Sequence, residues 1–136
     1  MPDQVLINGC NVSKNFQLWE YACPCCQLVK LKTRLVLSVQ ELRDYLGIPM
    51  RFNSAFRCNK HNKEVGGSPT SEHKEGGAID ISDLILPIVT HPDILRKMGF
   101  TTVLYYPGKH FWHLDVRERD FVVNLNYHPT TKAQGV

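Results

Sequence analysis

Long apolar runs are missing from this sequence of 136 residues. The longest, such as residues 84–89, are far shorter than the roughly 20 residues that a membrane-spanning helix needs. A secretory leader is missing as well, because Pro2, Asp3 and Gln4 make the beginning polar. We therefore expect no membrane segment, no export by the standard secretory route, and synthesis in the cytoplasm.

A strong charge of either sign is also absent. The chain has 16 Lys and Arg residues against 13 Asp and Glu residues, a formal net charge of +3. The basic residues are scattered and form no patch interleaved with aromatic residues of the kind that nucleic-acid-binding proteins carry. We therefore expect no nucleic-acid partner.

Internal repeats and low-complexity segments are likewise lacking. Apolar residues make up 43% and charged residues 21% of the chain, which is typical of a globular protein and excludes a disordered one. The length suits one domain with its own core. We therefore expect a single domain over residues 1–136, with a polar lead-in at about 1–14 and a polar tail at 121–136, and a monomer.

Five cysteines are present, and three of them crowd into the run Cys23-Pro-Cys25-Cys26, with Cys10 and Cys58 apart. An odd number in a chain without a leader argues against a full disulfide framework. Two interpretations of the cluster stay open. One is a group of free, partly buried thiols, which is the commoner outcome. The other is a structural zinc, because closely spaced thiolates suit that metal.

Hydrophobic periodicity predicts one long helix over residues 28–46. Gly47 follows as a cap at its C-terminal end, and Pro49 prevents the helix from continuing. The apolar residues recur at spacings of three and four, so they form one buried face, made of Leu31, Leu35, Val39, Leu42 and Leu46.

The other segments read as short strands, a loop and a short helix. We expect a strand over 50–56, a loop over 58–70 with a short helix near 61–65, a buried strand around Asp80, a helix from about 93 to 99, and a hairpin of 101–106 with 111–116. Together these elements predict an α+β fold in which a small antiparallel sheet has helices packed on one face.

The stretch from Ser71 to Asp80 places an imidazole and a carboxylate seven residues apart. His73 and Asp80 offer a nitrogen and an oxygen ligand, and both types suit zinc. Gly76 and Gly77 allow a tight turn between the two ligands. Asp80 lies within the predicted strand Ala-Ile-Asp-Ile, where an ionised carboxylate would be costly to bury without a partner such as a metal.

A catalytic zinc usually has three protein ligands and a water, so a third ligand is needed. The segment 109–117 alternates as a strand, which puts Phe111, His113 and Asp115 on one face. We assign His113 as the third ligand. The expected zinc ligands are therefore His73, Asp80 and His113.

The motifs S-x-H-x-x-G-x-A-x-D and W-H-x-D resemble those of the zinc D-Ala-D-Ala carboxypeptidase and L-alanyl-D-glutamate endopeptidase family, which includes VanX-type dipeptidases and phage endolysins. Residues 53–57 resemble the family's S-x-x-R segment, and Asn62 and Gly66-Gly67 stand where phage-type members carry N and GG. The resemblance runs from about residue 16 to about residue 117. It implies a zinc site on the small α+β fold shared with the Hedgehog signalling domain.

From this resemblance we expect a zinc metallopeptidase that hydrolyses an amide bond in the stem peptides of bacterial peptidoglycan. The D-Ala-D-Ala bond, the L-Ala-D-Glu bond and the stem cross-links are all candidates. Because we see neither a leader nor a separate wall-binding domain, we favour a phage-encoded or phage-derived enzyme delivered to the cell wall at lysis. Two rivals stay open: a non-catalytic zinc-binding or wall-binding module, and a phage structural protein with the same fold.

The match departs from the family at one position. VanX-like members carry a glutamate as general base three residues before the last histidine ligand, and this chain has His110 there. An imidazole can accept a proton near neutral pH, so His110 is the favoured base and Asp115 the alternative. A histidine three residues before a zinc ligand could equally be a fourth ligand or a substrate contact. Asp115 could instead orient His113. The resemblance also implies that Arg57 stabilises the substrate carbonyl oxygen or the oxyanion, unless it forms a structural ion pair.

Overall fold

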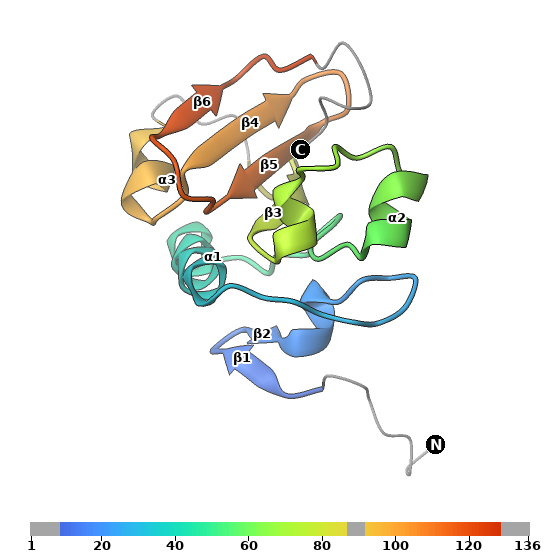
Figure 1. The fold of residues 1–136 in the computed structure, drawn as a ribbon. Helices are drawn as coiled ribbons and strands as arrows, with labels where there is room; N and C mark the ends of the chain where they lie inside the picture. Colours follow the sequence, from blue (N-terminus) through green and yellow to red (C-terminus); the bar gives the residue numbers. More distant parts are fainter. Residues whose placement is uncertain (1–8, 87–91, 129–136) are drawn as a thin grey trace.

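The chain forms a four-stranded sheet, one long and several short helices and an N-terminal hairpin, seen in Figure 1 as a computed structural model. The structure describes residues 9–86 and 92–128. Within these ranges, no helix has both the length and the apolar character needed to cross a bilayer. The described elements are, in order, β1 (Asn11–Ser13), β2 (Phe16–Gln17), η1 (Leu18–Tyr21), α1 (Thr33–Leu46), α2 (Asn59–Glu64), η2 (Glu72–Glu75), β3 (Ala78–Ser82), α3 (Asp93–Lys97), β4 (Thr102–Tyr106), β5 (Phe111–Asp115) and β6 (Val122–Asn124).

The main sheet has the strand order β3-β5-β4-β6. Both β3 and β4 run antiparallel to β5, which lies between them. The predicted hairpin of β4 with β5 and the predicted strand around Asp80 are therefore confirmed. The expectation of an α+β fold built on a small antiparallel sheet is confirmed as well.

The strands place the predicted ligands and the main apolar core on opposite faces of this sheet. The register sets Ile79 opposite Leu114, and Asp80 opposite His113. Because side chains alternate along a strand, one face, which we call the site face, carries Asp80, His113 and Asp115. The other face, the core face, is apolar and is made of Ile79, Ile81, Val103, Tyr105, Trp112 and Leu114.

Helices α1 and α3 pack on the core face, as expected. Leu35, Val39 and Leu42 of α1 and Leu95 of α3 belong to the same buried cluster as the core-face side chains. In Figure 1, α1 lies between the sheet and the hairpin of β1 with β2. Strand β1 lies at the end of the expected lead-in.

The long helix begins later than predicted. It starts at Thr33, so the expected start at Leu28 is wrong. The preceding backbone is used for tertiary contacts: the Lys32 amide donates to the Gly76 carbonyl at 2.9 Å, and the Lys32 ammonium pairs with Glu72. A helical turn there would take this backbone away from its partners. The predicted end is confirmed, because Gly47 caps the helix with a φ of 68°.

The expected strand over residues 50–56 does not form. Only one bridge, between Ser54 and Asp80, joins this segment to the sheet. Further along, the Phe56 amide donates to the Tyr21 carbonyl and the Arg57 amide to the His73 carbonyl. The segment divides its hydrogen bonds among three neighbours, which explains why no regular ladder develops. It still delivers Arg57 beside β3, while α2 begins two residues before the expected short helix.

Strand β6 lies in a segment that we expected to be a polar tail, so that expectation is wrong for residues 122–124. β6 runs parallel to β4, and the Val122 amide donates to the Thr101 carbonyl at 2.8 Å. The valines of β6 suit a strand, and β4 offers its open edge. Residues 1–8 of the lead-in and 129–136 of the tail lie outside the described residues.

Candidate metal centre

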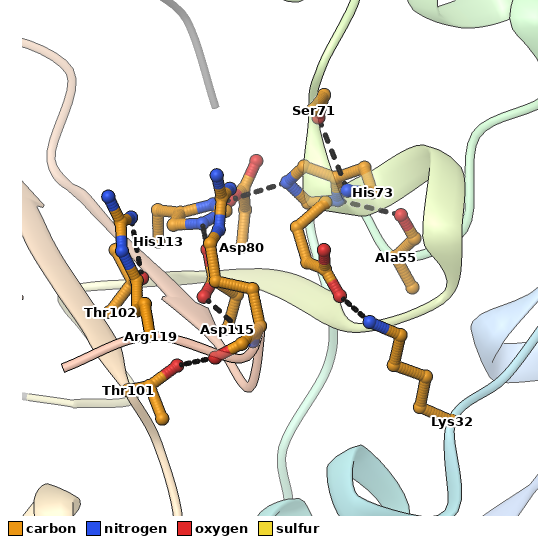
Figure 2. A network of polar contacts seen from close by, with 12 residues as sticks. Lys32, Ala55, Ser71, His73, Asp80, Thr101, Thr102, His113, Asp115 and Arg119 are labelled. Atoms are coloured by element: carbon orange, nitrogen blue, oxygen red, sulfur yellow. Dashed lines mark hydrogen bonds and ion pairs between the residues drawn. The ribbon is translucent and has the colours of Figure 1, made fainter. Parts of the chain in front are cut away.

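Three predicted ligands from three elements meet at one point. His73 lies in η2, Asp80 at the centre of β3, and His113 at the centre of β5, directly opposite Asp80. One ligand atom from each residue lies within 4.8 Å of the others, and all three side chains are buried. Figure 2 shows the two imidazoles turned toward Asp80 from opposite sides.

The protonation of His73 is set by a backbone carbonyl. Its Nδ1 lies 2.7 Å from the Ala55 oxygen, and because a carbonyl only accepts, Nδ1 carries the proton. The other nitrogen, Nε2, lies 3.1 Å from Asp80 Oδ1 and is left with a lone pair. Ser71 caps η2, because its hydroxyl oxygen accepts from the His73 amide at 3.2 Å. Ser71 thus supports the site by hydrogen bonding.

The orientation of His113 is set by a carboxylate. Its Nε2 donates to Asp115 Oδ2 at 2.7 Å, so Nδ1 is the nitrogen that faces Asp80, at 3.1 Å. Asp115 is held in turn by Arg117, whose Nε donates to the same oxygen at 3.1 Å. A carboxylate behind a ligand histidine fixes its ring and raises its basicity. Of the two roles considered for Asp115, its contacts are those of the orienting one.

Burial and charge together shape the protonation of the three residues. Burial raises the pKa of Asp80, but His73 and His113 outweigh it and hold the pKa well below its usual range. Burial lowers the pKa of His73. Burial also lowers the pKa of His113, but hydrogen bonds to Asp115 and Asp80 outweigh it and raise that pKa. A metal would therefore compete with a proton at Nδ1 of His113.

The donor set fits zinc. Two imidazole nitrogens and one carboxylate oxygen are common zinc ligands, with bonds of about 2.0 Å. In a tetrahedron of that size, neighbouring ligand atoms are about 3.3 Å apart. Asp80 Oδ1 lies 3.1 Å from each facing nitrogen, so small adjustments would admit the ion. His73, Asp80 and His113 can therefore hold zinc as predicted.

Arg57 is fixed next to the predicted metal ligands. Its Nη2 lies 3.3 Å from Asp80 Oδ2, the oxygen that does not face the histidines. Its Nε donates to Ser54 Oγ at 3.0 Å and its Nη1 to Asn62 Oδ1 at 3.2 Å. Asn62 is held by a 2.9 Å bond to the Ser68 carbonyl. Arg57 therefore forms a structural ion pair, and its action on a substrate stays a prediction.

The two glycines after α2 leave room for this arrangement. A Cβ on Gly67 would lie 2.2 Å from Asn62 Oδ1 and 2.9 Å from Arg57 Nη1. Gly66 has a φ of 75°, which favours glycine. Asn62, Gly66 and Gly67, which match the N and GG of the sequence motif, therefore support Arg57. The motif alone did not indicate this role.

His110 is not brought to the three ligands. Its side chain is 76% exposed, and Nδ1 lies 3.0 Å from Asp83 Oδ2. The same oxygen accepts from the Tyr105 hydroxyl at 2.9 Å, and Tyr105 belongs to the core face. His110 thus reaches toward the side of the sheet opposite the metal ligands. Its assignment as the general base stays a prediction.

Sequence reasoning missed two contributors to the site. The Ala55 carbonyl fixes the tautomer of His73, but a backbone group leaves no signal in the side-chain sequence. Arg117 supports Asp115, and its position two residues after Asp115, on the same face of the predicted strand over 109–117, was the available signal.

Removing the charge behind His113 should weaken zinc binding. We expect Asp115→Asn to raise the zinc dissociation constant about 10- to 100-fold, the usual effect of losing a carboxylate behind a ligand histidine. Competition with a chromophoric chelator would measure it. Asp83→Asn is the matched control, since Asp83 also bonds a histidine, His110, away from the three ligands. Equal affinities in parent and Asp115→Asn would contradict the orienting role.

Filling the space at Gly67 should disturb Arg57 and Asn62. We expect Gly67→Ala to lower the free energy of unfolding by about 1–3 kcal/mol, because the added methyl must displace both side chains. Urea unfolding would measure the change. Gly108→Ala is the control, since its Cβ would meet nothing within 4 Å. An equal loss in both variants would argue against a specific role for Gly67.

Two comparisons with known proteins bear on this site. A search of curated proteins found no significant match. The family described as Peptidase M15 matches residues 10–115, a range that contains Arg57, Asn62 and all three ligands. The match covers most of the chain and agrees with the resemblance drawn from the motifs. The chain therefore belongs to the peptidase M15 family and is a metallopeptidase of that family.

Proposed function

We propose that the chain is a zinc-dependent hydrolase that cleaves an amide bond in the stem peptides of bacterial peptidoglycan. The observation that carries the proposal is the meeting of His73 Nε2, Asp80 Oδ1 and His113 Nδ1 within 4.8 Å, in a chain of the peptidase M15 family. Catalytic zinc sites have three protein ligands, whereas structural sites have four. Three ligands therefore favour catalysis over a structural ion.

The residues of the chain would prepare the site for hydrolysis. Zinc, when bound, supplies a Lewis acid and a water of lowered pKa. The Ala55 carbonyl and the Asp115 carboxylate hold the two imidazoles in the protonation states that leave one nitrogen of each for the metal. Rigid support of this kind keeps the reacting groups in place without reorganisation during the reaction.

Arg57 would act on the substrate carbonyl. Its guanidinium carries a positive charge next to Asp80, and bonds to Ser54 and Asn62 fix its position. A fixed cation beside a cleavage site stabilises the negative charge that develops on the carbonyl oxygen. We propose that Arg57 turns one of its donors to that oxygen and keeps its bond to Asn62.

A pocket next to this arginine suits an anionic peptide. It has a volume of about 490 Å³, and its lining includes Asn62, which accepts from Arg57, together with Gly67 and two lysines, Lys63 and Lys74. Stem peptides carry carboxylates, which lysine ammonium groups attract. We propose that this pocket binds part of the stem peptide.

We also propose that the protein acts as a monomer and reaches the cell wall when a phage lyses its host.

The two candidate bases take different roles in this proposal. Asp115 is fully buried and already accepts from His113, so it orients the ligand. His110 is the proton acceptor, and its exposed ring would leave Asp83 when the substrate binds. This role requires the His110 ring to turn from Asp83 to the site face when the substrate binds, because catalytic hydrogen bonds often form only in the substrate complex.

A second function is favoured by the position of His110. A domain that binds zinc and a wall peptide without cleaving it needs no base, and His110 is bonded to Asp83 away from the ligands. Such a module would use the same three ligands and the same pocket. Turnover separates the two functions.

The central test is hydrolysis of defined wall fragments. We expect the zinc-loaded chain to cleave purified muropeptides, with products identified by mass spectrometry, which also names the bond. His73→Ala and His113→Ala should each abolish cleavage, because each removes a ligand. His128→Ala, at an exposed histidine, is the control and should keep full turnover. Binding of muropeptides without products would favour the non-catalytic module.

The role of His110 has its own test. We expect His110→Ala to lower kcat by about 10²- to 10⁴-fold, the usual contribution of a general base, while zinc content stays the same. His110→Glu should restore a good part of kcat, because VanX-like relatives place a carboxylate at this position. Steady-state kinetics on a muropeptide would measure both. A parent-like kcat in His110→Ala would remove His110 from the mechanism.

A further inference from the structure

A second group of metal-binding side chains lies apart from His73, Asp80 and His113. It consists of Cys23, Cys25, Cys26 and Cys58, whose sulfur atoms all lie within 4.8 Å of one another. Three of these cysteines share one short loop after η1, and Cys58 comes from the start of α2. The fold therefore joins two segments of the chain that are more than 30 residues apart.

The spacing of the sulfur atoms matches a tetrahedral site. Cys23 Sγ lies 3.5 Å from Cys25 Sγ and 3.7 Å from Cys58 Sγ, and Cys25 and Cys58 are 3.4 Å apart. With zinc–sulfur bonds of about 2.3 Å, the sulfurs of a four-thiolate site are about 3.8 Å apart. A disulfide would need about 2.0 Å. The observed distances are therefore closer to those of shared metal ligands than to those of a disulfide.

The backbone turns the sulfurs toward one point and supplies donors to them. The Gln27 amide donates to the Cys23 carbonyl at 2.8 Å, and Gln27 has a φ of 63°, so the loop closes tightly. The His61 amide donates to Cys58 Sγ at 3.4 Å. Donors directed at sulfur favour the thiolate, which is the form that binds metal.

We propose that Cys23, Cys25, Cys26 and Cys58 bind one zinc ion in a four-thiolate structural site, separate from the three-ligand centre. On binding, the four thiols release their protons to solvent and each sulfur donates one electron pair to the ion, so no oxidation takes place. Four protein ligands close the coordination sphere, which is the mark of a structural site. Cys10 is not in this group and stays a free thiol.

The proposed ion would stabilise the support of Arg57. Cys58 follows Arg57 directly and caps α2, whose Asn62 holds the guanidinium. An ion bound to Cys58 would fix this segment to the loop of Cys23. The inference does not depend on hydrolysis, because it concerns a structural link that a non-catalytic module would need equally.

Cobalt provides the test that distinguishes the two centres. The full chain, reduced and handled without oxygen, would be loaded with Co²⁺ and measured by absorption spectroscopy. We expect an intense thiolate-to-cobalt charge-transfer band in the parent and in His73→Ala. Cys10→Ser is the matched control and should keep the band, whereas Cys25→Ser and Cys58→Ser should each weaken it strongly. A parent spectrum without the band would overturn the proposal.

Zinc counts and thiol titration make the test independent of how well the cysteine variants fold. We expect about two zinc ions per chain in the native parent and about one in His73→Ala. In the zinc-loaded parent, we expect only one of the five thiols to react fast with a thiol reagent. Five fast-reacting thiols, or a disulfide found by mass spectrometry, would overturn the site. If the band is present but no muropeptide is cleaved, the structural zinc stands and the hydrolase proposal fails.

Discussion

The pairing of Asp80 with His113 across β3 and β5 is the constraint on which the rest of the site depends. The register sets these residues opposite each other, and a shift by one residue would turn both to the core face. Once a carboxylate is buried there, it needs partners on both oxygens. His73 and His113 face Oδ1, and Arg57 faces Oδ2. The apolar core face fixes the register, so core packing and metal geometry depend on each other.

The two histidines reach the same carboxylate oxygen through different nitrogens, and their supports explain why. His73 gives its Nδ1 proton to a backbone carbonyl and offers Nε2, whereas His113 gives its Nε2 proton to Asp115 and offers Nδ1. A carboxylate draws the shared proton more strongly than a carbonyl, so His113 should be the more basic ligand. The raised pKa of His113 and the lowered pKa of His73 agree with this.

The sequence was sufficient to predict that His73, Asp80 and His113 come together, because two of the three lie on regular strands. Asp80 and His113 occupy strands in which apolar and polar residues alternate. The sheet face on which each side chain lies could therefore be predicted from the two-residue period of a strand alone. Prediction failed where tertiary contacts decide. The helix start at residue 28 was displaced because Lys32 bonds to Gly76, and β6 forms because β4 has an open edge. The partner of His110 could not be predicted either, since Asp83 is distant in sequence and is brought to His110 by the pairing of β3 with β5.

The irregular segment from Ser54 to Cys58 links these features. Its carbonyls bond to the Asp80 amide and to His73, its Arg57 side chain pairs with Asp80, and Cys58 reaches the cysteine loop. A regular strand would direct alternate backbone groups to one neighbour and could not serve η2, β3 and the cysteine loop together. The loss of regular structure here is therefore a condition for bringing the ligand histidine, the arginine and the cysteines to their positions.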